Sequence, residues 1–559
     1  MRRRVASLGS LAAALSLALT TALTVAPAQA NPLAGPGQQV AAQQTADIRL
    51  LAINSFGGAL SPPEGPQSTI TRPDGTTAPA GGAAYLSAYL EQLRATSPNS
   101  LLFTVGDNVG STPLESSLFH DEPTIEFLNS LNIATSAIGN HELDAGFTEL
   151  LRLKNGGCHP VDGCQFGEGF SGARFPIVAS NIVFDNGRPA TLPFTVNFAG
   201  TIPVGTIAIT PADTPSRVTP DGVAGLRFTD EITEINRTAD LLDFLGVKTI
   251  VLLLHEGIPT EGCDAAGRVH EVASAASPKV DVIFTGQNSG QYNCVLPDPD
   301  GRPRSVLQSN GRGRGVSVAD VTVDLATGEV LRDRVATFNQ VVTRDITPNP
   351  TAAALVARAE ELSAETSQRP IGEVSEKIDR HRDETGQSAL GNLVADAQLA
   401  ATTASGAQVA LTNPGGLRAS LEKGPVNYAS AHNVQPFRNQ LRTLTLTGAQ
   451  LNAVLEQQFR SDGDVVLAPS ANLAYDVSAA APAGQKVRNL RIAGVEVARD
   501  ALVRVTVNKF LAEGGDGFTE LAKGVDVVGG PTDLGAFADY LSAASPVAAP
   551  ARNRIGSVN

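Results

Sequence analysis

The sequence predicts a two-domain α/β (α+β) protein, and three observations carry this prediction. The chain has 559 residues, which is more than one hydrophobic core usually holds. Its first part contains short apolar runs of strand length separated by helical patterns, as expected for strands buried under helices. Near residues 348–370 the composition changes to a run rich in Ala and Glu that is bounded by prolines. We interpret this run as a helical connector.

The first thirty residues predict an export signal. A basic start at residues 2–4 precedes an apolar stretch, and Ala28-Gln29-Ala30 offers a small-residue cleavage site. We therefore expect cleavage near Ala30 and a secreted, extracellular or cell-envelope protein. A membrane anchor is the alternative, but a Gly/Pro/Gln-rich tract without a stop-transfer pattern follows. We predict residues 31–45 as a disordered lead-in.

The overall charge is acidic, with a formal net charge of −14 at pH 7. This balance argues against nucleic acid as a bulk partner, because the phosphate backbone is repelled by a negative surface. An acidic surface by itself indicates only solubility. An anionic substrate would therefore need a local group of cationic side chains.

The four cysteines form two pairs that are close in sequence. In an exported chain, such pairs predict the disulfides Cys158–Cys164 and Cys263–Cys294. A metal site is the alternative, yet no histidine stands at zinc-finger spacing beside either pair. We expect disulfides.

Polar residues follow five apolar runs of the first part, which we predict to be buried strands. The runs cover residues 48–53, 101–105, 135–138, 249–254 and 280–284. In open α/β sheets, ligand sites form beyond the carboxyl ends of the strands. We therefore expect the five polar tails to converge.

Two of these tails carry the residue types of a metal-dependent phosphoesterase. Asn140 and His141 stand side by side and can serve a metal and a phosphoryl oxygen, while Asp144 can orient the imidazole. Asp107 can bridge two cations. Polar tails are also common as caps and turns, so one tail alone would be weak support.

These motifs resemble the bacterial 5′-nucleotidase family, in which a calcineurin-like metallophosphoesterase domain precedes a nucleotide-binding domain. The resemblance implies a four-layer β-sandwich with flanking helices, joined by a helix to a second α/β domain. On this basis we divide the chain into a phosphoesterase-like domain, a helical linker, a C-terminal substrate-binding domain and a tail, at residues 46–345, 346–370, 371–545 and 546–559.

Several metal ligands that the resemblance implies are missing. The family's first motif is Asn-Asp-x-His-Gly and its last is Gly-His-x-His, so the expected ligands are lost at Ser55, Gly57, Gln287 and Ser289. One ion would keep only Asp107. The other would keep Asp107, Asn140 and His255, with the Gln287 amide in place of a histidine. Such a set implies at most one weakly bound divalent ion, Mn, Mg, Ca or Zn, or none.

The second domain carries the residue types of a nucleoside pocket. Two phenylalanines can sandwich a purine, and a carboxylate can accept the ribose hydroxyls. The resemblance implies base stacking by Phe437 and Phe510, a ribose contact by Asp516, and base or phosphate contacts by Asn413 and Arg418. Core packing is the alternative for both rings.

The sequence thus predicts a protein that binds nucleosides or nucleoside monophosphates and has lost most or all phosphoester hydrolysis. By family geometry, His141 and Asp144 would stabilise the transition state. An active hydrolase with a rebuilt or mononuclear centre is the first alternative, and a purely structural or adhesive surface protein is the second. We expect a monomer without a membrane span.

Overall fold

The computed structural model describes residues 44–258, 262–263, 267–288, 290–461 and 463–558. The predicted export signal, almost all of the predicted lead-in and Ser289 therefore lie outside the described residues. The first strand begins at Thr45, so the last residue that we assigned to the lead-in belongs to the fold.

Two six-stranded sheets form the centre of the first domain. In the first sheet four neighbouring strands pair in parallel, and the other two strands are joined through antiparallel pairs. Its order is β16 (Ala336–Val341), β15 (Gly315–Asp324), β1 (Thr45–Ile53), β4 (Ser100–Thr104), β5 (Thr135–Ala137) and β6 (Ile177–Val178).

The second sheet has four parallel central strands and an antiparallel strand at each edge. Its order is β13 (Tyr292–Pro297), β14 (Pro303–Gln308), β12 (Val282–Thr285), β11 (Thr249–Leu254), β9 (Ile202–Ile209) and β8 (Phe194–Ala199).

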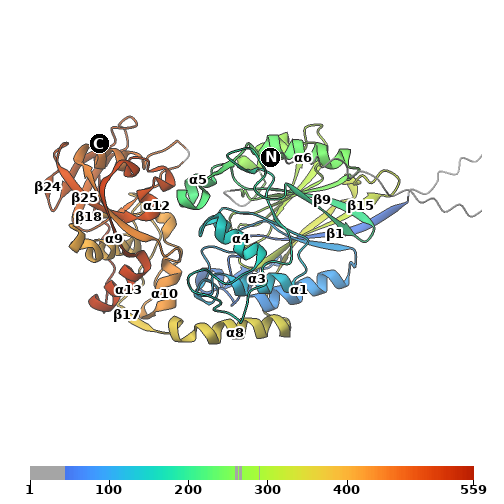
Figure 1. The fold of residues 1–559 in the computed structure, drawn as a ribbon, viewed down its shortest axis with the longest axis horizontal. Coiled ribbons are helices and arrows are strands. Elements are labelled where there is room, and N and C mark those ends of the chain that lie inside the picture. The colour runs from blue at the N-terminus through green and yellow to red at the C-terminus, as the bar shows by residue number, and fades with distance from the viewer. Residues whose placement is uncertain (1–43, 259–261, 264–266, 289, 462, 559) are drawn as a thin grey trace, which may run out of the picture. The chain divides into compact units, whose positions relative to one another are not determined.

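Helices cover the outer faces of both sheets, so the domain has four layers (Figure 1). Buried side chains such as Phe103 and Phe284 pack between the sheets. Helices α1 (Ala83–Ala95) and α3 (Glu122–Ser130) pack on one outer face, and α6 (Glu231–Phe244) and α7 (Arg268–Ala275) on the other. The predicted sandwich with flanking helices is confirmed.

Smaller elements complete this domain around the sheets. They are the helices α2 (Leu114–Ser117), α4 (Phe147–Asn155) and α5 (Thr214–Arg217) and the strands β2 (Thr69–Thr71), β3 (Thr77–Pro79), β7 (Ile182–Phe184) and β10 (Leu226–Phe228). The connector is helix α8 (Pro350–Ser367), which packs on α1 and α2. The Asn349 side chain caps α8 by accepting the Ala352 N–H, and Pro350 occupies its first turn, where no donor is lost.

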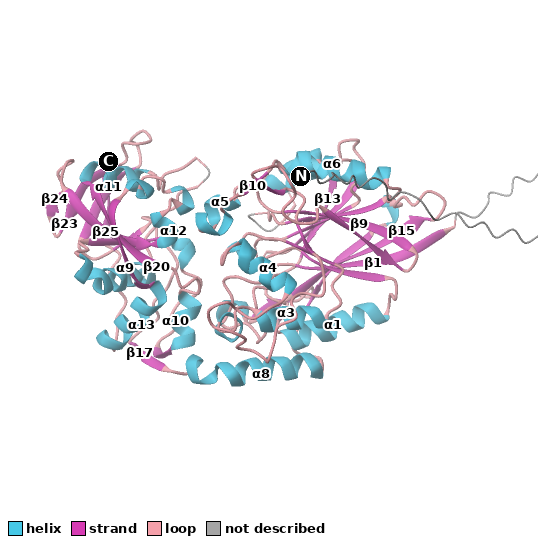
Figure 2. Cartoon of the chain, in the orientation of Figure 1, coloured by secondary structure: helices cyan, strands magenta, loops and turns pink. Residues whose placement is uncertain are grey.

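The second domain is a mixed sheet with helices against it (Figure 2). The sheet order is β21 (Ala468–Pro469), β18 (Val409–Thr412), β25 (Leu502–Asn508), β20 (Gln440–Thr447) and β26 (Val525–Thr532). The helices are α9 (Ala389–Thr402), α10 (Tyr428–Val434), α11 (Gly448–Glu456), α12 (Lys509–Ala512) and α13 (Asp533–Ala544). A two-stranded sheet of β17 (Pro370–Val374) and β19 (Gly424–Asn427) lies at its start.

The end of the chain corrects one expectation. We predicted residues 546–559 as a tail, but β27 (Ile555–Val558) joins a sheet of β24 (Val495–Glu496), β23 (Val487–Ile492), β22 (Leu473–Ser478) and β27. Strand β27 pairs in parallel with β22. Beside it, the buried Arg554 forms an ion pair of 2.7 Å with Asp396. The end of the chain is therefore part of the second domain.

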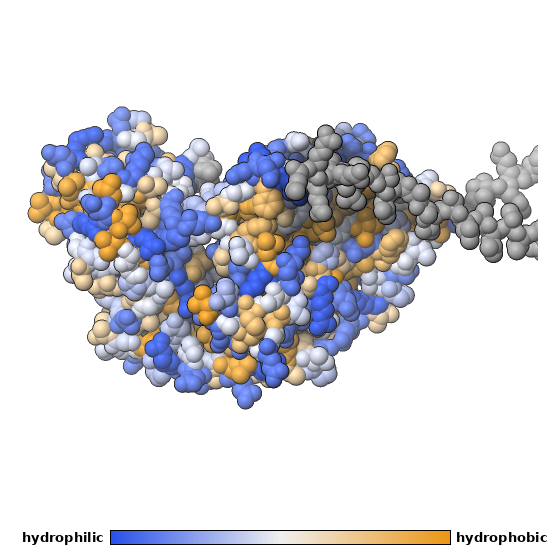
Figure 3. Space-filling model, viewed as in Figure 1, coloured by the Kyte–Doolittle hydropathy of each residue, from blue (hydrophilic) through white to orange (hydrophobic). Residues whose placement is uncertain are grey.

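Both predicted disulfides, Cys158–Cys164 and Cys263–Cys294, are present. Among the described residues, no helix combines the length and the apolar composition needed to cross a bilayer. The face drawn in Figure 3 mixes hydrophilic and hydrophobic residues over both domains.

Candidate functional site

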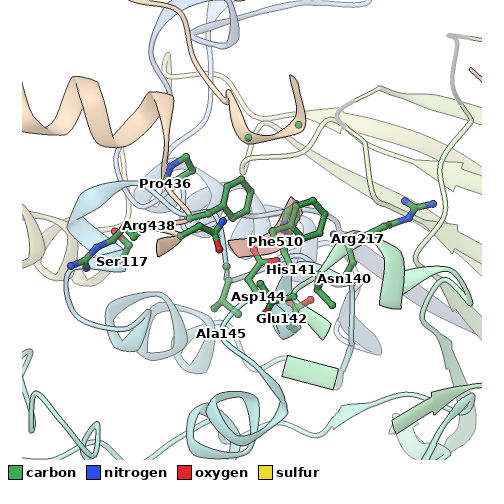
Figure 4. A pocket seen from close by; sticks show the side chains of 18 of the residues that line it. Ser117, Asn140, His141, Glu142, Asp144, Ala145, Arg217, Pro436, Arg438 and Phe510 are labelled. Atoms are coloured by element: carbon green, nitrogen blue, oxygen red, sulfur yellow. Dashed lines mark hydrogen bonds and ion pairs between the residues drawn. The ribbon is translucent and has the colours of Figure 1, made fainter. Parts of the chain in front are cut away.

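A pocket of about 480 Å³ is lined by loops of both domains. Asp107, Asn140 and Gln287 reach it from strand ends of the first domain, and Phe437 and Phe510 from the second. Figure 4 shows Asn140, His141, Glu142 and Asp144 gathered near Phe510. The polar tails after β4, β5 and β12 therefore meet, as the sheet topology predicts.

Glycine lets the loops after β4 and β5 approach each other closely. A Cβ on Gly106 would lie 2.5 Å from the Gly139 nitrogen, and a Cβ on Gly139 would lie 2.3 Å from Oδ1 of Asp107. Gly106 also has a φ of +86°, which favours glycine. No larger residue fits at either position without moving the backbone that carries Asp107.

The Glu142 carboxylate ties these two loops together. Its Oε2 accepts the N–H groups of Asp107 and Gly139, each at 2.7 Å, and its Oε1 accepts the Asn108 N–H at 2.7 Å. Burial and the nearby Asp107 charge raise the pKa of Glu142 to about 7, while these N–H groups favour the ionised form. We did not predict a role for Glu142 from the sequence, although it stands next to His141 in the same motif.

His141 has the partner that the sequence predicted. Its Nδ1 lies 2.7 Å from Oδ2 of Asp144, and its backbone N–H donates to Oδ1 of Asp107 at 3.0 Å. Burial opposes the charged ring, but Asp144 and Asp107 outweigh it and raise the pKa of His141. Phe437 stacks on the imidazole with 5.9 Å between ring centroids. A charged imidazole held in this way can donate to an anionic oxygen.

His255 and Asp107 face each other in the buried part of the site. The His255 Nδ1–H donates to the Val105 carbonyl at 2.5 Å, so Nε2 points toward Asp107, 3.1 Å from its Oδ2. Although burial disfavours a charged ring, Asp107 raises the pKa of His255 to about 9. Burial would raise the pKa of Asp107, but His255 and His141 hold it well below its usual range. A proton or another cation is therefore favoured between the two groups.

Two family models match the chain. Calcineurin-like phosphoesterase matches residues 68–286, and the 5′-nucleotidase C-terminal domain matches residues 366–523. The chain belongs to the 5′-nucleotidase family.

Family members that resemble this chain carry different names. Endonuclease YhcR of Bacillus subtilis (strain 168) is 30% identical over 93% of this chain, but the match spans only 41% of that protein. The snake venom 5′-nucleotidase of Naja atra is 26% identical over 82% of this chain and 90% of its own length. The 5′-nucleotidase precursor of Thermus thermophilus is 27% identical, with a TM-score of 0.76 over 92% of this chain and 99% of that one.

Calcineurin-like phosphoesterases use divalent metal ions, and one such ion fits the residues present. The Nε2 of His255 is buried without a hydrogen-bond partner, and its distance of 3.1 Å from Asp107 suits two ligands of one ion. Gln287 would bind the ion through its amide oxygen, because its buried amide nitrogen, which has no partner, is a donor. With Asn140, these four residues would hold the ion. A bound ion would polarise a phosphoryl oxygen.

The second ion of a dinuclear phosphoesterase does not fit the described residues. Ser55 carries a hydroxyl that is buried without a hydrogen-bond partner, and Gly57 has no side chain. Ser289 lies outside the described residues. Asp107 is the one ligand that remains from the set implied by the family, and a single carboxylate does not hold a divalent ion firmly.

The predicted nucleoside residues lie on the second-domain side of the pocket. The Asn413 amide donates to Oδ2 of Asp516 at 2.8 Å and accepts from Asn508 at 3.1 Å. Burial raises the pKa of Asp516, and the Asn413 bond counteracts this shift. The carboxylate is thus oriented toward the pocket by an amide chain from two strand ends.

The two phenylalanines differ in their surroundings. Phe437 is half-buried, and the central guanidinium carbon of Arg418 lies 5.9 Å from its ring centroid. Phe510 is buried and belongs to the core cluster of the second domain, although it also lines the pocket. A Cβ on Gly515 would lie 2.4 Å from the Phe510 ring, so glycine is needed there. Phe437 therefore has more free ring surface than Phe510.

The pocket also contains cationic residues that we did not predict from the sequence. Arg217, at the end of α5, and Arg438, beside Phe437, both line it. Arg438 is next to a residue that we had selected, so its position in the sequence could have pointed to it. Arg217 follows no predicted strand, and no sequence pattern that we used would have found it.

Proposed function

We propose that this protein binds nucleosides or nucleoside monophosphates and hydrolyses their phosphoester weakly or not at all. The main support is that the nucleoside side of the pocket has its predicted residues, whereas the phosphoesterase centre lacks several metal ligands. The ring, carboxylate and guanidinium residues of the nucleoside side share one pocket, whereas the described residues of the phosphoesterase centre fit one cation position. The two matched ranges, residues 68–286 and 366–523, support the proposed domain division at residues 46–345 and 371–545.

Loss of the second cation explains why hydrolysis would suffer. Two-metal phosphoesterases use paired cations to stabilise the attacking and the leaving oxygen. Here the second position would rest on Asp107 alone among the described residues. The retained His141–Asp144 pair, 2.7 Å apart, can still contact a phosphoryl oxygen but does not replace a cation.

Export is part of the proposal. The predicted signal precedes the described residues, and the chain contains two disulfides, which are typical of oxidising compartments. One relative bears the name of a venom nucleotidase. We therefore propose that the protein meets extracellular or cell-envelope nucleotides, as a monomer and without nucleic acid as a bulk partner.

An adenosine titration tests the nucleoside pocket. Phe437→Ala should weaken adenosine binding about tenfold, because stacking of a base on an aromatic ring contributes roughly 1–3 kcal/mol. The double variant with Phe510→Ala should weaken it further. Phe244→Ala is the control, since that ring is 86% exposed and lies outside the pocket. Equal affinity in the wild type and the folded Phe437→Ala protein would refute the proposal.

A mononuclear hydrolase is the second candidate. It is favoured by the His255–Asp107 pair, which fits one ion, and by the intact His141–Asp144 pair. Addition of Mn²⁺ to the chelator-treated protein distinguishes the two candidates. The second candidate requires rapid AMP turnover to appear with the ion, whereas our proposal expects AMP to be bound with weak turnover or none.

A further inference from the structure

Arg312 lies where a family metal ligand would be expected. Its backbone N–H donates to the Ser55 carbonyl at 2.9 Å, which ties the loop after β14 to the loop after β1. An ideal Cβ on Gly57 would lie 3.6 Å from a terminal nitrogen and 3.8 Å from the central carbon of the Arg312 guanidinium. A histidine at position 57 would extend into or against this group. The glycine and the arginine are thus spatially linked.

The Arg312 guanidinium has no fixed counter-ion. Within the described ranges, no hydrogen bond or ion pair to its side chain is present, although the residue is mostly buried. Burial, followed by the like charges of Arg418 and Arg314, lowers the pKa of Arg312 to about 10, and Asp107 opposes this shift. A cation with these surroundings is costly unless an anion pairs with it.

Arg418 carries a second guanidinium without a hydrogen-bond or ion-pair partner among the described residues. Its side chain lines the pocket. Burial lowers the pKa of Arg418, while Asp144 and Asp107 of the phosphoesterase side oppose this shift. The Arg418 charge is near enough to Arg312 to lower the pKa of Arg312. In a chain of net charge −14, such a pair of like charges indicates an anion site.

We propose that Arg312 takes the place of one of the two metal ions and, together with Arg418, binds a phosphoryl group directly. The ligand is the phosphate of a nucleoside monophosphate or inorganic phosphate. For the nucleoside, this inference rests on the proposed function. It adds to that function the groups that hold the phosphate when the paired metal ions are lost.

The chemistry of a guanidinium accounts for binding without turnover. Its planar fork donates two parallel hydrogen bonds to phosphate oxygens. Unlike a divalent ion, it does not generate a hydroxide from a bound water near neutral pH. A site with an arginine in place of one metal ion therefore keeps its affinity for phosphate but loses one source of the attacking hydroxide.

Calorimetric titration of the full chain with inorganic phosphate, in EDTA, tests the inference. The wild type should bind phosphate without metal. Arg312→Gln should bind phosphate at least about tenfold more weakly, as expected when a charge-assisted hydrogen bond is lost. Arg312→Lys should give an intermediate affinity, because it keeps the charge but not the fork. Arg499→Gln is the matched control, since it removes the same charge from an exposed position.

Adenosine binding separates the two proposals. Arg312→Gln should bind adenosine like the wild type, which also shows that the variant is folded. If the wild type bound phosphate through Arg312 but no adenosine, the proposed nucleoside function would fail and this inference would stand. Equal phosphate affinity of the wild type and Arg312→Gln would overturn the inference, as would phosphate binding that disappears in EDTA and returns with Mn²⁺.

Discussion

Replacing Glu142 by glutamine should disorder the phosphoesterase side of the pocket. The carboxylate accepts the backbone N–H groups of Asp107, Asn108 and Gly139, each at 2.7 Å. Glutamine has nearly the same shape but carries an NH₂ group in place of one oxygen. Whichever way the amide is turned, at least one backbone N–H faces another donor.

The size of the effect follows from these bonds. A hydrogen bond to a charged group contributes about 1.5–3 kcal/mol, and a buried donor without an acceptor costs about 1–3 kcal/mol. Glu142→Gln removes the charge from three short bonds and leaves at least one donor unsatisfied. We therefore expect a loss of about 3 kcal/mol or more in the free energy of unfolding.

Urea unfolding, followed by circular dichroism, measures this loss. Glu329→Gln is the control, because Glu329 is exposed and its side chain is outside the site. Binding of a divalent ion should weaken in Glu142→Gln, since Asp107 is no longer held, while adenosine binding should persist. A variant that unfolds at the wild-type urea concentration would refute the assignment of Glu142 as the residue that joins the two loops.

Two further predictions concern stability. Burial lowers the pKa of His432 to about 4, so between about pH 6.5 and 4 the unfolded chain binds a proton that the folded chain does not. Between pH 7 and pH 4 the free energy of unfolding should therefore fall by about 3 kcal/mol more in the wild type than in His432→Gln. Urea unfolding that changes equally with pH in the two proteins would contradict this. Removing the Cys263–Cys294 bridge, which spans 31 residues, should lower the free energy of unfolding by about 3–4 kcal/mol. Removing Cys158–Cys164, which spans 6 residues, should lower it less. A lower melting temperature without Cys158–Cys164 than without Cys263–Cys294 would contradict this prediction.

Much of the fold follows from local patterns in the sequence. Five apolar runs correspond to β1, β4, β5, β11 and β12. Because the sheets place the carboxyl ends of these strands together, the chemistry of Asp107, Asn140 and His141 could be anticipated. The connector helix α8 was visible from its Ala/Glu composition and the flanking prolines.

The remaining features depend on contacts between distant segments. Strand β27 has only four residues, and its pairing with β22 and the Arg554–Asp396 ion pair have no local signal. Arg312 follows β14, which we did not predict as part of the site. Its importance depends on its distance from Gly57, across 255 residues of sequence, and only the folded chain brings the two together.

Metal stoichiometry combined with AMP turnover tests the central claim most directly. His120, His159 and Asp162 could hold an ion outside the phosphoesterase centre, since their ligand atoms all lie within 4.8 Å of one another, so the measurement includes His159→Ala. The His159→Ala protein, purified without chelators, should carry at most one divalent ion. AMP should remain intact in its presence. Two such ions with rapid phosphate release would contradict the account.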